Sequence, residues 1–288
     1  MKIHRIETGR VRIKENQIKR TKGILPPMIT VLFGKKWAEW VPIYAWVIDH
    51  EEGIIVVDTG ETYKTSVKGY LPAWHPYYAL AVEFDVKPED EIGPQLQRMG
   101  IDPTTDVSKV IMTHMHTDHA GGLHHFPNSE IIIEKNEYYS AKGIQGLMAG
   151  YLPHRWPKWL NPTLIDIPLN FYHTFSKSMP LTTDGKIMIV ATPGHVANHL
   201  SVIVEDGGMY YFLAGDTSYT QENLIKEIPD GVGTNESMTT LKNIVSFSKL
   251  NPTIYLPSHD PLVPERMNNK EIVPCYEEVH FLDNLYKV

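Results

Sequence analysis

The feature of this sequence that most constrains its fold is the heptapeptide Thr-His-Met-His-Thr-Asp-His at residues 113–119. It places three histidines and one aspartate within six positions. In an extended segment, side chains two residues apart project to the same side, so His114 and His116 can hold one metal ion. Past a turn, Asp118 and His119 can face a second ion. Imidazole nitrogen and carboxylate oxygen suit zinc, and also iron, cobalt or manganese, so the segment predicts bound divalent metal.

Four strand-like runs each end shortly before a residue that can bind a metal. These residues are His114 after 110–112, His195 after 187–190, Asp216 after 210–213 and His259 after 253–256. Open α/β sheets commonly place their sites at the carboxyl ends of strands, so the four residues are expected to converge on one edge.

The complete set of candidate ligands contains five histidines and two aspartates, which is too many for one tetrahedral ion and suits two. Asp216 is the natural bridge between the ions because it is a lone carboxylate at the end of its strand. We expect one ion to be held by His114, His116 and His195, and the other by Asp118, His119 and His259.

The composition sets the class of protein. A chain of 288 residues with 42% hydrophobic residues can bury a substantial core, and the formal net charge of -7 argues against nucleic acid as the main partner. The single cysteine, Cys275, excludes an intrachain disulfide and supports a reducing compartment. No apolar run approaches the roughly 20 residues of a membrane span, and the N-terminus lacks the apolar stretch of a signal peptide. We therefore expect a cytoplasmic protein without a membrane partner.

The pattern of apolar residues predicts a mixed α/β fold. Helical spacing is clearest over 92–99 and 237–250. Further strands are expected over 44–48, 54–57, 131–133 and 200–204. Without repeats or linker-like stretches, residues 1–288 are predicted to form a single domain, with aromatic-rich insertions near 61–91 and 146–162. Most of these aromatic residues are expected to pack in the core or in a homodimer contact, and a few to line a pocket.

The ligand segments resemble the metallo-β-lactamase superfamily. Its signature, His-x-His-x-Asp-His followed by a distant Gly-His, a bridging Asp and a final His, is matched by 114–119, Gly194-His195, Asp216 and His259. The early Asp-Thr-Gly of the family also appears, at 58–60, where the Asp usually orients a metal ligand. The resemblance implies a four-layer αβ/βα sandwich, and residues 1–288 would form one such domain.

Finer features are most similar to the N-acyl homoserine lactone lactonases, which are quorum-quenching enzymes. These features are Thr192-Pro193-Gly194-His195 with His199, then Asp216-Thr217-Ser218-Tyr219, then His259-Asp260. The resemblance implies a hydrolase that opens a lactone ring by attack of a hydroxide bridging two metal ions. Tyr219 would stabilise the oxyanion and Asp118 would carry the proton to the leaving alkoxide. The expected partner is a small lactone or ester substrate.

Other functions remain open at this stage. Thioesterases of the glyoxalase II type resemble this ligand set but have a substantial basic helical region after the last ligand, whereas 29 residues follow His259 here. A phosphodiesterase of the same superfamily would need a basic face for phosphate. A β-lactamase with a cysteine ligand is disfavoured because Asp216 and Tyr219 stand in that region. A further alternative is a metal-binding module without catalytic activity. The complete ligand set argues against it, because a protein without catalysis does not need to keep two ions.

The remaining histidines have no ligand spacing with the predicted set and are expected to be ordinary side chains. They are His4, His50, His75, His124, His125, His154, His173 and His280.

Overall fold

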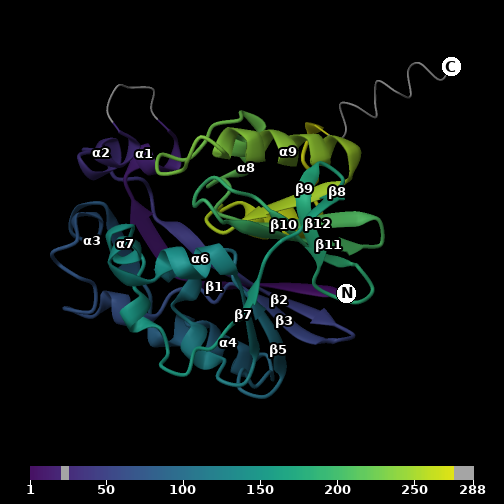
Figure 1. The fold of residues 1–288 in the computed structure, drawn as a ribbon, viewed down its shortest axis with the longest axis horizontal. Helices are drawn as coiled ribbons and strands as arrows, with labels where there is room; N and C mark the ends of the chain where they lie inside the picture. Colours follow the sequence, from purple (N-terminus) through teal and green to yellow (C-terminus); the bar gives the residue numbers. More distant parts are fainter. Residues whose placement is uncertain (21–25, 276–288) are drawn as a thin grey trace. The chain divides into compact units, whose positions relative to one another are not determined.

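The computed structural model describes residues 1–20 and 26–275, and His280 therefore lies outside the described residues. The chain divides into two compact units, Met1–Asp166 and Ile167–Val288, which we call the first and second units. Each unit contains one β-sheet with helices (Figure 1). The mixed α/β class predicted from the sequence is confirmed, whereas the single domain over 1–288 stays a prediction. Among the described residues, no helix is both long enough and apolar enough to cross a membrane.

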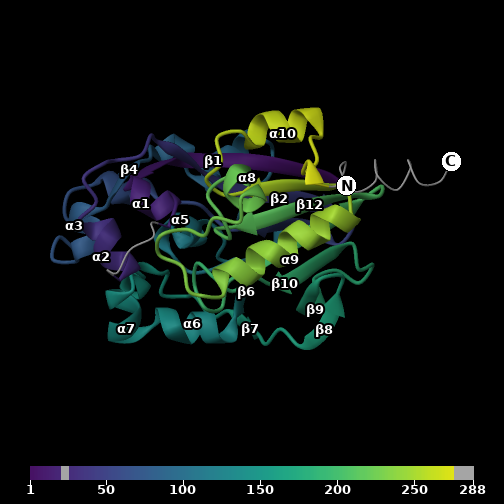
Figure 2. The same ribbon diagram turned by 90° about the horizontal axis from the view of Figure 1, so that it is seen from above.

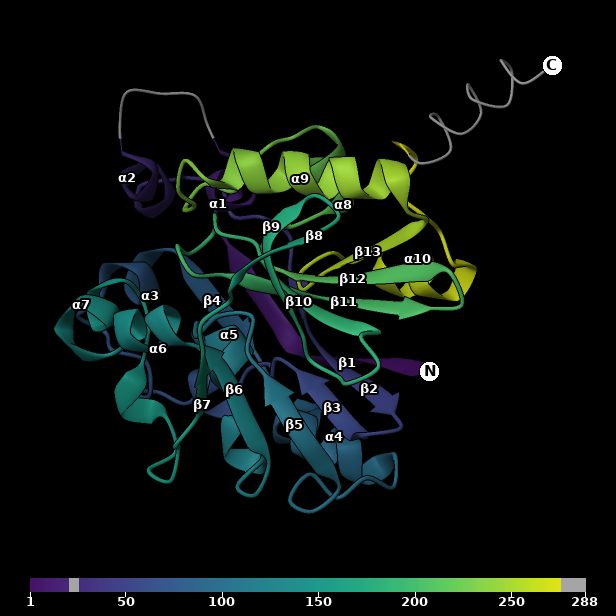
Figure 3. The same ribbon diagram turned by 45° about the vertical axis from the view of Figure 1, so that its right-hand side comes forward.

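The first unit is built on a seven-stranded sheet in the order β4-β1-β2-β3-β5-β6-β7. Strands β3, β5, β6 and β7 run parallel, and β1, β2 and β4 add antiparallel pairs (Figure 3). The strands are β1 (Lys2–Ile13), β2 (Val41–His50), β3 (Gly53–Val57), β4 (Val82–Asp85), β5 (Val107–Ile111), β6 (Glu130–Glu134) and β7 (Thr163–Ile165).

Short helices connect these strands. They are α1 (Glu15–Ile18), α2 (Pro27–Leu32), α3 (Pro76–Leu80), α4 (Ile92–Arg98), α5 (Thr117–Ala120), α6 (Lys135–Ala141) and α7 (Gly143–Met148), with 3-10 helices η1 (Tyr63–Ser66), η2 (Pro88–Asp90), η3 (Leu123–His125) and η4 (Pro153–Arg155). The aromatic-rich segment 61–91 contains η1, α3, β4 and η2, and 146–162 contains the end of α7 and η4. Strand β4 of the first segment also closes one edge of the sheet.

Strand β1 is the main element that the sequence pattern did not predict. Its apolar residues Ile6, Val11 and Ile13 are buried but are separated by charged residues, so no continuous apolar run marks the strand. It pairs with β2 and, near its end, with β4. The register with β2 shifts around Gly9, whose φ of 122° is a backbone conformation that glycine adopts easily.

The second unit contains a six-stranded sheet in the order β13-β12-β11-β10-β9-β8. Helix α9 packs on this sheet, as Figure 2 shows, and contributes Leu241, Ile244 and Phe247 to a core shared with β10, β11, β12 and β13. The elements are β8 (Leu169–Tyr172), β9 (Phe175–Pro180), β10 (Ile187–Ala191), β11 (Leu200–Asp206), β12 (Met209–Gly215), β13 (Thr253–Pro257), α8 (Gln221–Ile225), α9 (Ser237–Leu250) and α10 (Val263–Asn269).

Strand directions explain how each unit gathers its candidate ligands. In the second unit β12 and β13 are parallel, and β10 has the same direction because β11 lies antiparallel to both β10 and β12. The residues that follow these three strands therefore lie at one edge of that sheet. In the first unit β3 and β5 are parallel, so the segments following them also share an edge. The four strands predicted before the candidate ligands are confirmed as β5, β10, β12 and β13.

Candidate metal centre

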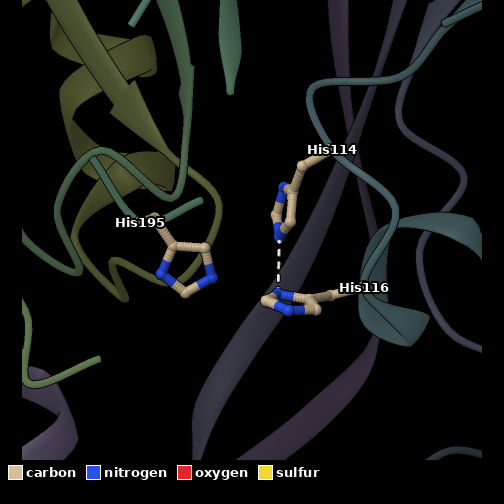
Figure 4. A group of neighbouring side chains, drawn as sticks. All are labelled: His114, His116 and His195. Carbon is tan, nitrogen blue, oxygen red and sulfur yellow. Dashed lines mark hydrogen bonds between the residues drawn. The ribbon is translucent and has the colours of Figure 1, made fainter. Parts of the chain in front are cut away.

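The first unit brings four predicted ligands together in one tight turn. The chain leaves β5, reaches His114, and enters α5 directly after His116, so Asp118 and His119 lie in the first turn of that helix. The ring of His114 lies 4.8 Å from that of His116 and 4.1 Å from that of His119, measured between centroids. Nitrogen atoms of His114 and His116 are 3.0 Å apart (Figure 4). The turn that the sequence predicts between the two ligand pairs is therefore present as α5.

Asp58, directly after β3, holds this turn in place. Its two carboxylate oxygens accept hydrogen bonds from the amide and hydroxyl groups of Thr113, each at 2.8 Å. One of them also lies 2.8 Å from Nδ1 of His119. The side chains of Asp58 and His119 are fully buried. A carboxylate bound to one imidazole nitrogen fixes the ring and directs the other nitrogen toward a metal, so Asp58 has the contact expected of an orienting residue.

Two glycines after the ligand segment permit close packing of this turn. A Cβ atom at Gly121 would lie 2.4 Å from a carboxylate oxygen of Glu61, and one at Gly122 would lie 2.3 Å from the carbonyl oxygen of Thr59. Such distances are too short for non-bonded atoms. Any larger residue here would move the turn that carries His119.

Tyr151 and Glu137 support the other side of the turn. The ring of Tyr151 lies 4.7 Å from that of His116, and its hydroxyl donates to Glu137 at 2.8 Å. The same carboxylate oxygen accepts a hydrogen bond from the amide of Met115 at 3.1 Å. Burial, reinforced by the Glu137 carboxylate, holds the pKa of Tyr151 well above its ordinary value, so its hydroxyl stays protonated. Tyr151 belongs to an aromatic segment that the sequence predicts to be mainly packing, and here it contacts a candidate ligand.

A cavity of about 210 Å³ opens in the first unit beside the ligand turn. Its wall combines Thr117 of α5 with Tyr70 and Trp156 from the two aromatic-rich segments, and with the cationic side chains of Lys64 and Arg155. Glu61 also lines the cavity and is fully buried; burial, with a smaller contribution from Asp118, raises its pKa to about 8.

The second unit brings the remaining three predicted ligands together. One carboxylate oxygen of Asp216 lies 3.5 Å from Nε2 of His195, and the other lies 3.3 Å from Nε2 of His259. All three residues are buried. The two oxygens of this carboxylate therefore face two different imidazoles.

His195 has a carboxylate partner that the sequence analysis missed. Asp230 lies 2.5 Å from Nδ1 of His195, and its other oxygen accepts a hydrogen bond from the amide of Gly233 at 2.6 Å. The contact leaves Nε2 of His195 directed at Asp216. No local pattern marks Asp230, because it follows its partner by many residues and lies in a loop between α8 and α9.

Replacing Asp230 with asparagine is expected to weaken zinc binding by about 10- to 100-fold, since the imidazole loses its orienting carboxylate. The affinity is measured by competition with a chromophoric chelator. Asp166→Asn, at an exposed carboxylate, is the control and should bind zinc as the wild type does. Equal affinity of Asp230→Asn and the wild type would contradict the orienting role.

His199 and Tyr219 complete the surroundings of the second set. His199 accepts a hydrogen bond from the amide of Asp216 at 3.1 Å, and its other nitrogen lies 2.9 Å from the hydroxyl of Thr192. It therefore fixes the backbone that carries Asp216. The buried ring of Tyr219 stacks on that of His259, with centroids 5.4 Å apart and planes inclined by 26°.

The donor chemistry of the two sets fits divalent zinc. The first unit offers three imidazoles and a carboxylate, the second offers two imidazoles and a carboxylate, and orienting carboxylates already occupy Nδ1 of His119 and His195. Within each unit, the structure thus places the predicted ligands side by side.

The sequence profile of the Metallo-beta-lactamase superfamily matches residues 38–259. The N-acyl homoserine lactonase AiiA of Bacillus thuringiensis subsp. kurstaki is 28% identical over an alignment of 227 residues, and the match covers 76% of this chain and 82% of AiiA.

Solved structures show the same fold. A variant of B. thuringiensis AiiA with N-decanoyl-L-homoserine at its active site has a TM-score of 0.71 at 22% identity, covering 94% of this chain and 97% of AiiA. AidC, a dizinc quorum-quenching lactonase solved with a product, has a TM-score of 0.61 at 16% identity, covering 90% of this chain and 87% of AidC.

Proposed function

Because this chain belongs to the metallo-beta-lactamase superfamily, we propose that its two ligand sets jointly hold two zinc ions and that it opens the ring of N-acyl homoserine lactones. It is a metal-dependent hydrolase of this family. The observation that carries the proposal is the position of Asp216, whose two oxygens face His195 and His259. The names of the relatives then favour lactones over other substrates of the superfamily.

In this proposal each ion has its own histidines and shares Asp216. His114, His116 and His195 bind one ion, and Asp118, His119 and His259 bind the other. Bound zinc would supply a water nucleophile at neutral pH and polarise the carbonyl group that is attacked. Asp58 and Asp230 keep His119 and His195 in their binding orientation.

Tyr219 and Asp118 then stabilise the negative charge that develops on the carbonyl oxygen and transfer the proton of the attacking water. Water oxygen bonds to the lactone carbonyl carbon, and the ring bond from that carbon to oxygen breaks. The hydroxyl of Tyr219, held by stacking on His259, donates a hydrogen bond to the carbonyl oxygen as negative charge develops on it. Asp118 accepts the proton of the water and delivers it to the leaving alkoxide, so the product is the hydroxy acid.

We assign the acyl portion of the substrate to the cavity beside α5. Thr117 lines this cavity and is the sequence neighbour of Asp118, while Tyr70 and Trp156 provide aromatic surface. Each aromatic-rich segment would then contribute one aromatic wall residue. By opening acyl homoserine lactones, the enzyme would quench quorum signals. The cytoplasmic location and the homodimer expected from the sequence stay predictions.

A panel of substrates tests the reaction class. The zinc-loaded enzyme is assayed with N-hexanoyl homoserine lactone, a simple aryl ester, S-lactoylglutathione and bis-nitrophenyl phosphate. Lactone opening far above the other three supports the proposal. Preferential thioester cleavage would indicate a glyoxalase-type enzyme, and preferential phosphodiester cleavage would indicate a nuclease-like relative.

Tyr219→Phe is expected to lower kcat for the lactone by about 100-fold, the usual effect of removing one oxyanion donor. Zinc content should not change, because the ring that stacks on His259 remains. Stopped assays with pH-indicator detection give kcat, and elemental analysis gives the metal content. Tyr211→Phe, on β12, removes a hydroxyl outside the proposed site and should leave kcat unchanged. An unaltered kcat in Tyr219→Phe would rule out the oxyanion role.

A further inference from the structure

A third group of side chains with the chemistry of metal ligands lies in the first unit and uses none of the seven proposed ligands. It consists of Glu91, which immediately precedes α4, and His124 and His125, which lie in η3. Ligand atoms of all three lie within 4.8 Å of one another. The sequence analysis treated both histidines as ordinary, because their carboxylate partner is far away along the chain.

The hydrogen bonds of Glu91 leave one of its oxygens for the two histidines. Its Oε1 atom accepts from the hydroxyl of Thr62 at 2.7 Å and from the amide of Tyr63 at 2.9 Å. Its Oε2 atom lies 2.6 Å from Nε2 of His125 and 3.2 Å from Nε2 of His124. Burial raises the pKa of Glu91, but hydrogen bonds from His124, His125 and Thr62 outweigh it and hold the pKa well below its ordinary range. The carboxylate is therefore anionic at neutral pH.

The hydrogen bond of Nδ1 of His124 determines which nitrogen of the neutral ring carries the proton. Nδ1 of His124 lies 3.1 Å from the carbonyl oxygen of Gly121, which can only accept a hydrogen bond, so Nδ1 carries the proton. In the neutral ring, Nε2 then has a lone pair, and that lone pair faces a carboxylate oxygen. Two lone pairs at this distance repel each other unless a proton or a metal cation lies between them.

A proton on Nε2 of His124 would meet this requirement at one ring only. The two rings lie side by side, with centroids 4.0 Å apart and planes inclined by 37°. A single divalent cation would instead accept the lone pairs of both rings and balance the carboxylate.

The surroundings keep the three side chains close together. A Cβ atom at Gly93 would lie 2.3 Å from Nδ1 of His125, so the position of this ring requires glycine in the first turn of α4. The Glu91 side chain is 4% exposed, whereas those of His125 and His124 are 19% and 36% exposed. The carboxylate is thus anchored inside the unit, and the imidazoles lie where an ion can arrive from solvent and retain water ligands.

We propose that Glu91, His124 and His125 form an additional binding site for one divalent transition-metal ion such as Zn²⁺. Two imidazoles and one carboxylate are a ligand set that zinc accepts, and open positions would be filled by water. His124 also lines the cavity beside α5, so an ion held here would place positive charge at the wall of that cavity. The site uses none of the ligands or catalytic residues of the proposed reaction.

The test counts zinc ions. Protein purified with its resident metal is titrated with Zn²⁺ by isothermal titration calorimetry, and the bound metal is counted by elemental analysis after gel filtration. We expect the double variant His124→Gln/His125→Gln to bind one equivalent fewer than the wild type. The control double variant His50→Gln/His154→Gln removes two histidines outside the group and should bind the wild-type number.

Each result bears on the proposal whether or not the enzyme is a lactonase, because the readout is the difference between variants. Equal zinc counts in the wild type and the His124/His125 variant would overturn it. Should the double variant misfold by circular dichroism, the single variant His124→Gln replaces the more exposed ligand. It should weaken the additional site at least about 10-fold, and unchanged affinity there would equally overturn the proposal.

Discussion

Asp216→Ala is expected to lower kcat/KM for N-hexanoyl homoserine lactone by about 1000-fold or more and to reduce the content of both proposed ions. Bound metal contributes several kcal/mol of charge stabilisation to such reactions, and each 1.4 kcal/mol corresponds to a factor of about ten. Asp216 is the residue whose loss affects both ions, since its two oxygens face different histidines. Steady-state kinetics and elemental analysis on the same preparations measure the two effects.

Two comparisons make the Asp216 result specific. Asp206→Ala removes a carboxylate at the end of β11, in the same unit but outside the ligand set, and should retain both ions and full activity. Asp216→Asn keeps the size of the side chain and should still lose metal, because an amide is a poor bridge. Two full equivalents of zinc in Asp216→Ala would contradict the bridging assignment.

Phe247→Ala is expected to lower the free energy of unfolding by about 3–5 kcal/mol, the usual cost of truncating a buried phenylalanine. Phe247 is fully buried on the face of α9 that meets the sheet. Its ring lies within 5.2–6.4 Å of five aromatic rings, between centroids. These rings belong to Tyr172, His173, Phe175, Tyr210 and Phe212.

Urea denaturation followed by circular dichroism measures this loss. The experiment is run with excess chelator, because bound metal stabilises the folded state by mass action and would obscure the comparison. Phe171→Ala truncates a ring that is 79% exposed in the same unit, and its effect should stay within about 0.5 kcal/mol. A similar, small loss for both variants would show that the aromatic cluster does not stabilise the second unit.

Sequence reasoning succeeded where the physical signal was local. Helix α9 has the bounds predicted for it, because its apolar residues recur at helical spacing over fourteen residues. The strands that precede His114, His195, Asp216 and His259 were recognisable as apolar runs that stop at turn-forming residues. The structure shows that the seven candidate ligands fall into two compact sets, and their role as ligands stays a prediction.

The features that were missed depend on contacts between distant residues. Asp230 binds His195 across 35 positions, and Glu91 meets His125 across 34, so neither pairing leaves a mark in a short stretch of sequence. Strand β1 was missed for another reason. It alternates buried and charged residues and gains its stability from pairing with β2 and β4, and pairing partners cannot be read from one strand alone.

The parallel pairing of β12 with β13 has a consequence for the order in which the second unit forms. Strands β10, β11 and β12 follow one another as antiparallel neighbours, so their contacts close short loops. Strand β13 can join only after the chain has returned through α8 and α9, and such long closures are slow. His259, which follows β13, is therefore expected to come into contact with Asp216 only after β13 has joined the sheet. Formation of this contact would then indicate that the sheet of the second unit is complete.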